Sequence, residues 1–569
     1  MAIKMTPADY GPHIEQYLRA PETQSCYEYL HECYNRIRKD LGDDYIAFMI
    51  PVADQESAVR MPRLLADIEK LASYFASIGL KKGDVYTVFL PTCGHAVVAM
   101  YALNKLGIIA NYVHPMTPPN ALAEIMSHTK SKGIFTLDIL AGPFAPLLKN
   151  YPTVVGSVSD FCDGVALQYA LYNEKQNAKV PELDTITIYK DILKMDLPEA
   201  ELVKDMGKQD AFYMHGGGTT GRSKTIRLSS YAFNSLAYKF YLLDLPHDYK
   251  TAHAISAIPC FHAYGLAGVI HYGICNAYKP FLCAKFDARQ TNDIIRKYNV
   301  IEFIGVPKMF QKMMQEDNFE NEGTKNLAMV FAGSDIVSKA FVDEFDAIME
   351  KHGASARMCR GYGLTEVCGV VTSNGGAGPY RKDSTGFPLY GLTIEIWDDE
   401  CNKLPVGEVG EICVTGDSIM NGYLPDSVIN ESGIYTDENG VNWIRTGDMG
   451  YLDEDGFMYF AGRKKRIIII SGYNIYPATI EEKVDTLPYI NEVCAVQGYS
   501  EDGKPLVKLV VSLLDKEADH EKVIADLKAF CEANLESISV PRKYEIMDLL
   551  PRTKMEKIDF MKLSDPVPQ

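Results

Sequence analysis

The chain has 569 residues and a mass of 63.5 kDa, and 47% of its residues are hydrophobic. It is therefore long enough to bury large cores and to form more than one domain. Its formal net charge of -18 argues against nucleic acid and anionic membranes as partners. The N-terminus lacks a signal-peptide pattern, and no apolar run approaches the roughly 18 residues of a membrane span. We expect a cytoplasmic protein without an integral membrane segment. Thirteen cysteines without a C-x-x-C pair also fit a reducing compartment.

Strand and helix patterns alternate in the first part of the chain. Apolar residues at helical spacing predict helices over 64–79 and 95–106, and short apolar runs predict strands over 86–90 and 108–113. This alternation is typical of parallel β-α-β layers.

A glycine-rich segment follows, Tyr213-Met-His-Gly-Gly-Gly-Thr-Thr-Gly-Arg-Ser-Lys224. Glycines let backbone N–H groups approach an anion closely, Thr219 and Thr220 add hydroxyl donors, and Lys224 adds a positive charge. A strand over 210–214 precedes the segment and a helix over 231–241 follows it, which is the usual setting of a nucleotide loop. The segment therefore predicts a phosphate-binding loop.

The same segment leaves an alternative open. From Gly216 to Ser223 it reads G-x-x-x-x-G-R-S, one residue away from the Walker signature of P-loop NTPases. Arg222 stands where a P-loop has its lysine. A P-loop enzyme releases ADP and phosphate.

The pattern of predicted secondary structure changes twice after residue 385. Short strands with Gly, Pro and Asp turns over 386–459 predict a β-rich subdomain. After Gly462 a basic turn from Arg463 to Arg466 is followed by predicted strands over 467–470, 493–496 and 507–513 and a helix over 480–486. These elements indicate a small α/β unit of about 105 residues.

Further clusters of glycines with polar side chains are spread along the chain. In order they are Pro259-Cys-Phe-His-Ala-Tyr-Gly265, Arg360-Gly-Tyr-Gly-Leu-Thr-Glu366, Trp443-Ile-Arg-Thr-Gly-Asp448, Gly472-Tyr-Asn-Ile-Tyr-Pro477 and Pro551-Arg-Thr-Lys-Met-Glu-Lys557.

With these motifs in this order, the chain from about Ser25 to Asp559 resembles the adenylate-forming (AMP-binding) superfamily, and most of all its acyl-CoA synthetases, or carboxylic acid–CoA ligases. The resemblance implies an α/β fold. A large N-terminal domain, residues 1–462, has two α/β layers and a β-barrel subdomain at 386–460. A small mobile C-terminal α/β domain, residues 466–569, turns about a hinge at 463–465, with Lys465 as the pivot.

The resemblance also implies a reaction. A carboxylate attacks the α-phosphate of ATP to give an acyl-adenylate and pyrophosphate, and a thiol then takes the acyl group. The implied cofactors are ATP, Mg²⁺ and coenzyme A, or the phosphopantetheine arm of an acyl carrier protein in place of coenzyme A.

Site residues follow from the resemblance, position by position. The β- and γ-phosphates are expected to be bound by Thr219, Thr220, Gly221 and Lys224. The adenine is expected to be flanked by Gly333, Ser334, Gly361, Tyr362 and Gly363. Thr365 contacts the α-phosphate, Glu366 binds Mg²⁺, and Asp448 with Arg463 holds the ribose. Lys557 reaches the substrate carboxylate, His262 stands beside the carboxylate path, and Gly472 lines the thiol tunnel.

The substrate is narrowed mainly by exclusion. Residues 259–264 contain no acid that would bind an amino acid's ammonium group, and the apolar stretch 263–286 favours a fatty or aryl acid. Departures from the family pattern are Ser223 before Lys224, Thr225 after it, and Glu556 before Lys557. Three functions remain open: an acid–thiol ligase acting on coenzyme A or a carrier arm, a luciferase-type oxygenase, and a catalytically weak adenylate-binding protein.

Overall fold

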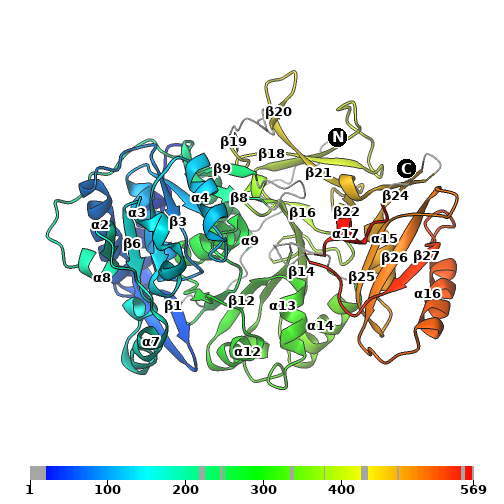
Figure 1. Ribbon diagram of the computed structural model, residues 1–569, viewed down its shortest axis with the longest axis horizontal. Coiled ribbons are helices and arrows are strands. Elements are labelled where there is room, and N and C mark those ends of the chain that lie inside the picture. The colour runs from blue at the N-terminus through cyan, green and yellow to red at the C-terminus, as the bar shows by residue number, and fades with distance from the viewer. Residues whose placement is uncertain are drawn as a thin grey trace.

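The computed structural model describes residues 21–216, 224–243, 248, 250–333, 337, 339–376, 378–424, 434–470, 473–552 and 558–566. Two α/β sheets lie side by side, an antiparallel sheet lies against both, and a small α/β unit forms one end of the molecule (Figure 1). The fold class predicted from the sequence is confirmed. Among the described residues, no helix has the length and apolarity needed to cross a membrane.

The first sheet has eight strands in the order β19-β9-β8-β4-β3-β5-β6-β7. Its strands are β3 (Val85–Val88), β4 (Ile109–Tyr112), β5 (Ser131–Leu137), β6 (Thr153–Gly156), β7 (Ile186–Ile188), β8 (Asp210–His215), β9 (Thr225–Ser229) and β19 (Gly422–Tyr423). Helices α2 (Met61–Ser77), α3 (Gly94–Lys105), α4 (Pro119–His128), α7 (Gly164–Asn177) and α8 (Tyr189–Ile192) accompany it. The helices and strands predicted over 64–113 are all present, shifted by one to three residues.

The second sheet has nine strands in the order β16-β15-β14-β13-β12-β10-β11-β1-β2. They are β1 (Ile46–Val52), β2 (Gln55–Arg60), β10 (His253–Ser256), β11 (Phe281–Leu282), β12 (Val300–Gly305), β13 (Met329–Ala332), β14 (Met358–Tyr362), β15 (Thr372–Ser373) and β16 (Phe387–Pro388). Helices α12 (Ala288–Lys297), α13 (Pro307–Met314) and α14 (Lys339–Lys351) accompany this sheet.

One large apolar core joins the two sheets. It is filled from α1 (Cys26–Leu41), α9 (Ser230–Leu243), the π-helical turn η5 (Leu266–His271) and α11 (Tyr272–Cys275), together with α3. Helix α3 is buried on every side, which matches its almost uniformly apolar sequence. This shared core fixes the ends of the strands from both sheets relative to each other, and the candidate site is built there.

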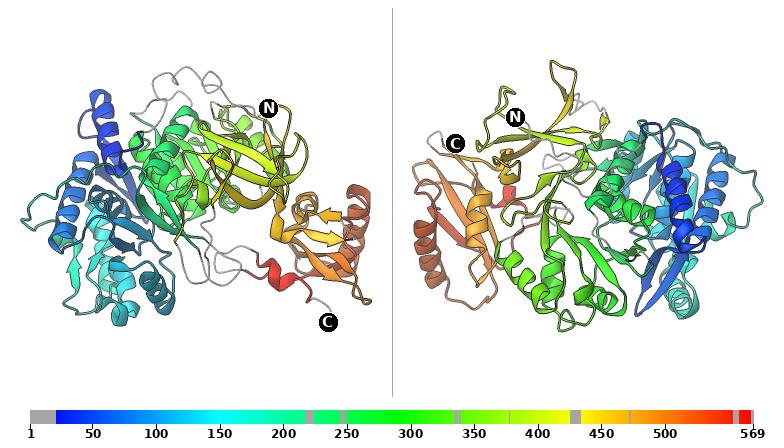
Figure 2. Two further views of the ribbon diagram at one scale, coloured as in Figure 1. Left: turned by 90° about the horizontal axis from the view of Figure 1, so that it is seen from above. Right: turned by 180° about the vertical axis from the view of Figure 1, so that it is seen from behind.

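The β-rich part is an antiparallel sheet in which β17, β18, β21 and β20 follow one another and β22 pairs with β21. Its strands are β17 (Leu392–Trp397), β18 (Gly410–Gly416), β20 (Ile434–Thr436), β21 (Asn442–Leu452) and β22 (Met458–Arg463). Figure 2 shows it between the α/β layers and the small C-terminal unit.

The C-terminal unit has its own apolar core, which includes Ile480, Leu509 and Cys531. Its elements are β23 (Ile468–Ile470), β24 (Tyr473–Ile475), α15 (Pro477–Val484), β25 (Ile490–Tyr499), β26 (Pro505–Leu513), α16 (His520–Asn534), β27 (Lys543–Ile546) and α17 (Phe560–Leu563). The sequence reading missed α16 and β27. The exact domain limits and the hinge at 463–465 stay predictions.

Candidate active site

The glycine-rich segment connects the two strands of a β-hairpin. Strands β8 and β9 pair antiparallel, with Tyr213 opposite Arg227, and the N–H of Gly216 donates to the carbonyl of Lys224 over 3.0 Å. A helix was expected as the next element, but β9 intervenes before α9. A Walker loop leads from a strand directly into a helix, so the hairpin contradicts the P-loop alternative. Thr219, Thr220 and Gly221 lie outside the described residues.

Lys224 and Glu366 meet on one tyrosine. The Lys224 ammonium lies 4.2 Å from the ring centre of Tyr423, and the Tyr423 hydroxyl donates to Glu366 Oε1 over 2.9 Å. Strand β19 carries Tyr423 and pairs with β9, which sets the ring beside the hairpin. Burial and the neighbouring Glu366 raise the pKa of Tyr423 far above its usual range, so the phenol remains a donor.

Glu366 itself is placed by a short turn at the end of β14. The turn η7 (Thr365–Val367) follows that strand, and Cys368 ends it in the left-handed region with φ 56°. The backbone N–H of Met420 donates to the Glu366 carbonyl over 2.8 Å. Thr365 and Glu366 are therefore held at the junction of the second sheet and the β-rich part, and both are partly exposed.

The glycines predicted to flank the adenine differ in how much room a Cβ would have. A Cβ on Gly333 would lie 3.5 Å from the carbonyl oxygen of Gly361 and 3.7 Å from Tyr264 Oη, so Gly333 and Gly361 are brought together beside this tyrosine. A Cβ on Gly363 would lie 1.9 Å from the carbonyl oxygen of Gly369, so backbone packing requires a glycine at position 363. Ser334 lies outside the described residues.

Asp448 is buried between two partners. The Tyr362 hydroxyl donates to Asp448 Oδ2 over 2.9 Å, and Arg463 Nε lies 3.2 Å from Asp448 Oδ1. Asp448 and Arg463 face each other across β21 and β22. Asp448 is only 3% exposed, whereas the Arg463 side chain is 62% exposed. Burial raises the pKa of Tyr362 well above its usual range, and Asp448 raises it further.

His262 lies at the N-terminal cap of a short helix, α10 (Ala263–Gly265), and is half-buried. Its ring centre is 5.0 Å from that of Phe261, which in turn packs 4.4 Å from His114. The backbone N–H of Cys260 donates to Thr92 Oγ1 over 3.0 Å, which ties this segment to the loop between β3 and α3. Two residues after His262, Tyr264 reaches Gly333, so the segment borders the predicted adenine site.

Arg360 was not among the predicted site residues. It lies on β14 opposite Ala332 of β13, directly before Gly361, and is 7% exposed. Its Nε and Nη2 have no hydrogen-bond partner among the described residues. A buried guanidinium without a partner is costly, and an anionic or acceptor-rich ligand would offset that cost. Its position inside the glycine motif was the available signal.

The segment predicted to be the hinge has one lysine held in ion pairs and one exposed lysine. Lys464 makes ion pairs with Glu411 at 3.1 Å and Asp399 at 2.5 Å, while Lys465 is exposed in the 3₁₀ turn Lys464–Arg466. Gly472 and Lys557 lie outside the described residues. The described residues that flank Lys557, Arg552 and Ile558, form an isolated antiparallel bridge, and Arg552 pairs with Glu492 of β25.

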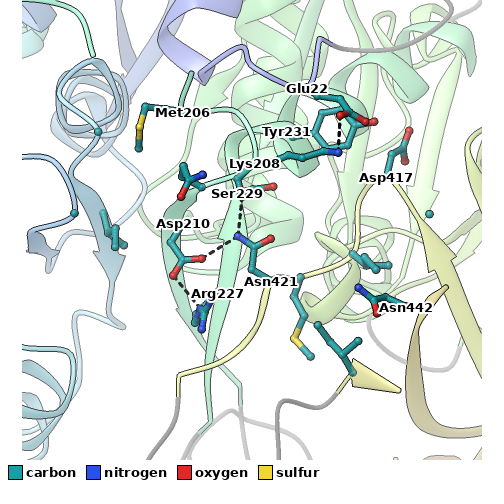
Figure 3. Close-up of a pocket in the computed structure, with 18 of the residues that line it drawn as sticks. Glu22, Met206, Lys208, Asp210, Arg227, Ser229, Tyr231, Asp417, Asn421 and Asn442 are labelled. Carbon is teal, nitrogen blue, oxygen red and sulfur yellow. Dashed lines mark hydrogen bonds and ion pairs between the residues drawn. The ribbon is translucent and has the colours of Figure 1, made fainter. Parts of the chain in front are cut away.

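A separate cavity of about 910 Å³ opens at the edge of the first sheet (Figure 3). Four of its charged side chains pair with one another, since Arg227 meets Asp210 at 2.9 Å and Lys208 meets Glu22 at 2.6 Å. Asn421 Nδ2 also donates to Asp210 over 2.9 Å. None of the described site residues predicted from the sequence lines this cavity, so we assign no ligand to it.

Comparison with known proteins decides the family. Residues 52–424 match the model of the AMP-binding enzyme, and residues 479–557 match that of the AMP-binding enzyme C-terminal domain. The chain belongs to the AMP-binding enzyme family. The predicted resemblance to adenylate-forming enzymes is thereby confirmed.

Relatives of this AMP-binding enzyme, and a solved structure with a similar fold, are named as CoA ligases. It is 30% identical to a long-chain-fatty-acid–CoA ligase of Bacillus subtilis over 508 residues, which is 87% of this chain and 88% of the relative. It is 28% identical to a probable 4-coumarate–CoA ligase of Dictyostelium discoideum, over 79% of this chain and 81% of that one. A benzoate CoA ligase from Burkholderia xenovorans shares its fold with a TM-score of 0.77 at 18% identity, over 94% of this chain and 99% of that one.

Proposed function

We propose that this AMP-binding enzyme is an acid–thiol ligase that uses ATP to activate a carboxylic acid as an acyl-adenylate, releases pyrophosphate, and transfers the acyl group to coenzyme A. The observation that carries the proposal is the meeting of Lys224 and Glu366 on Tyr423. It places a cation, which can bind phosphate, and a carboxylate, which can bind Mg²⁺, beside the same glycine-rich hairpin.

The nucleotide would be held from both sides of this point. Lys224, with Thr219, Thr220 and Gly221, holds the β- and γ-phosphates. Thr365 contacts the α-phosphate. Asp448, fixed by Tyr362 and Arg463, accepts hydrogen bonds from the ribose hydroxyls. The adenine would be flanked by Gly333 and Gly361, together with Ser334, Tyr362 and Gly363.

Glu366 is suited to Mg²⁺, because a hard cation is usually held by one or two carboxylates together with phosphate oxygens and water. When bound, Mg²⁺ supplies charge neutralisation at the phosphates. Lys557 would bring a further cation to the α-phosphate and the substrate carboxylate, where negative charge develops as the new P–O bond forms. Gly472 would then line the thiol tunnel after the small domain has turned about Lys465.

The acid is proposed to be a fatty or aryl acid. Among the described residues, those of the stretch 263–286 that lie in η5 and α11 are buried and apolar, apart from His271. His262 would stand where the acid enters. One relative named above has a long-chain fatty acid in its name and the other has 4-coumarate, an aryl acid. The experiment below therefore includes acids of both kinds and of different chain lengths.

A panel of carboxylic acids scored for pyrophosphate release, with and without coenzyme A, tests the proposal. We expect release with a fatty or aryl acid and thioester formation when coenzyme A is present. Thioester only with a phosphopantetheine-bearing carrier protein would favour the carrier-loading alternative. Oxygen-dependent turnover of a preformed adenylate would identify an oxygenase, and ATP binding without pyrophosphate release would identify a non-catalytic binder.

A further inference from the structure

A cysteine, a histidine and an aspartate form a linear arrangement at the start of helix α3, outside the residues assigned above. The Cys93 sulfur lies 3.9 Å from His95 Nδ1, and His95 Nε2 lies 2.8 Å from Asp160 Oδ2. We propose that Cys93 is an activated thiol and a site of oxidative modification, which hydrogen peroxide converts to a sulfenic acid.

Cys93 is partly exposed, unlike most other cysteines of the chain. Ten of the thirteen cysteines are buried, and only Cys93, Cys162 and Cys401 are partly exposed. Cys93 is also the N-cap residue of α3, a helix of twelve residues. The unsatisfied N–H groups and the positive end of the helix dipole there stabilise a thiolate.

The histidine is held rigidly in the orientation that serves Cys93. Its side chain is 1% exposed, and the rings of Phe135, Phe161 and Tyr189 meet it edge-on with centroids 4.7 to 5.5 Å away. A Cβ on Gly156 would lie 2.4 Å from His95 Nε2, so this glycine leaves the room that the ring occupies. One ring nitrogen therefore stays on Asp160 and the other stays on Cys93.

The charges around the ring favour the imidazolium. Asp160 accepts from the backbone N–H of Ser157 at 2.8 Å and faces Lys190 at 3.2 Å, and its pKa lies below its usual range. Burial lowers the pKa of His95, but the hydrogen bonds to Asp160 and Cys93 outweigh burial and raise it to about 9. Below that pH both ring nitrogens carry protons, and the one on Nδ1 is directed at the Cys93 sulfur.

Other titratable and charged groups that face this cluster come from the neighbouring elements. They are Arg63 and Asp67 of α2, Tyr189 of α8, and Cys260, whose pKa a charge on Cys93 raises. Arg63 is paired with Asp67, so Asp160 is the carboxylate that balances His95.

The proposed reaction is balanced by the groups present and the oxidant. The Cys93 thiolate attacks one oxygen of hydrogen peroxide, an S–O bond forms and the O–O bond breaks. The leaving hydroxide takes the proton from His95 Nδ1 and departs as water. Sulfur is oxidised by two electrons and the peroxide is reduced by two. A thiol such as dithiothreitol reverses the product.

Modification at Cys93 also bears on the proposed function. The preceding residue, Thr92, accepts the hydrogen bond from the backbone N–H of Cys260, two residues before His262. A group added to Cys93 would therefore press on the segment that borders the proposed acid path. This consequence rests on the proposed function, whereas the reactivity of the thiol does not.

A brief treatment of the native protein with iodoacetamide, followed by peptide mass spectrometry, measures the reactivity. Cys162 is the internal control, because it is also partly exposed and burial raises its pKa to about 11. At pH 7 we expect Cys93 to be alkylated at least ~10-fold faster than Cys162.

Two further arms complete the test. Pretreatment with hydrogen peroxide should protect Cys93 from alkylation, allow labelling by dimedone, and be reversed by dithiothreitol. His95→Gln should slow the alkylation of Cys93 toward the rate of Cys162, and Cys93→Ser should keep adenylation activity while abolishing its sensitivity to peroxide. Cys401, which receives a hydrogen bond from Arg445 at 3.2 Å, is monitored in the same digest.

The proposal is overturned if Cys93 in the wild-type protein reacts no faster than Cys162, or if peroxide treatment leaves Cys93 without a dimedone label. The comparison of the two cysteines within the wild-type protein decides the matter even where His95→Gln does not fold. If Cys93 is reactive but its modification leaves acid activation unchanged, the thiol assignment stands and only its link to the acid path is lost.

Discussion

Tyr423 donates its hydroxyl to Glu366 over 2.9 Å, and the face of the same ring lies 4.2 Å from the Lys224 ammonium. One side chain from β19, at the edge of the first sheet, thus contacts both a carboxylate that follows the second sheet and a lysine that precedes β9. Because hydroxyl and ring act on different partners, they can be separated by mutation.

Glu366→Gln should lower kcat/KM by ~100-fold and raise the Mg²⁺ concentration needed for half-maximal rate. The amide keeps an acceptor for Tyr423 but loses the negative charge that Mg²⁺ requires. Initial rates of pyrophosphate release over a Mg²⁺ titration measure both effects.

Tyr423→Phe is the matched control for this substitution. It keeps the ring under Lys224 and removes only the hydroxyl, so we expect a loss of about 5-fold, in keeping with one hydrogen bond of ~1 kcal/mol. Normal Mg²⁺ dependence in the Glu366→Gln enzyme would remove the metal assignment.

Arg360→Met should weaken ATP binding without destabilising the protein. The methionine removes a buried charge that has no partner for Nε and Nη2 among the described residues, so thermal stability without ligand should hold or rise. The KM for ATP should rise roughly 10-fold, because charge-assisted hydrogen bonds to the nucleotide are lost.

The exposed Arg357, which stacks on Tyr380 at 5.5 Å, offers the control Arg357→Met. Thermal unfolding with and without ATP distinguishes the two sites. A less stable Arg360→Met protein with an unchanged KM would make Arg360 a structural residue instead.

Lys465→Pro should spare pyrophosphate release more than thioester formation. Proline fixes φ at the proposed pivot and disfavours the helical conformation of Lys464 before it, so the small domain loses access to one orientation. The two half-reactions are assayed separately, with Lys465→Ala as the control for the lost charge. Equal loss of both half-reactions in the proline variant would argue for misfolding or a different pivot.

Lys557→Ala should abolish adenylate formation from acid and ATP, because the developing charge loses its cation. The same variant should still convert a supplied acyl-adenylate and coenzyme A into thioester. Glu556→Gly should raise the adenylation rate if that carboxylate restrains the neighbouring lysine. An adenylation rate equal to the wild type in Lys557→Ala would refute the role given to this motif.

Much of the fold could be predicted from local sequence patterns. The strand and helix sequence over 64–113 was predicted because apolar spacing there is unambiguous. Asp448 and Arg463, which the family motifs assign to the same ligand, face each other in the structure, and their ribose role stays a prediction. Strand β9 was missed because five residues between a glycine loop and a helix give little periodic signal.

Contacts between distant segments were not predictable in the same way. Tyr423 meets Glu366 across 57 residues, and His95 meets Asp160 across 65. Neither pair has a local pattern, because each depends on how separate elements pack. Arg360 was overlooked although it lies within a motif, since only its burial distinguishes it from a solvated arginine.

The central claim is that a carboxylate oxygen attacks the α-phosphate of ATP. The most direct test gives the enzyme an acid labelled with ¹⁸O in its carboxylate, together with ATP and coenzyme A. The masses of the phosphorus-containing products are then measured by mass spectrometry. The account predicts one ¹⁸O atom in AMP and none in pyrophosphate, because the oxygen that bridges acyl group and phosphorus stays with AMP when the thiol attacks the carbonyl carbon. Label in inorganic phosphate together with ADP, or AMP without label, would contradict it.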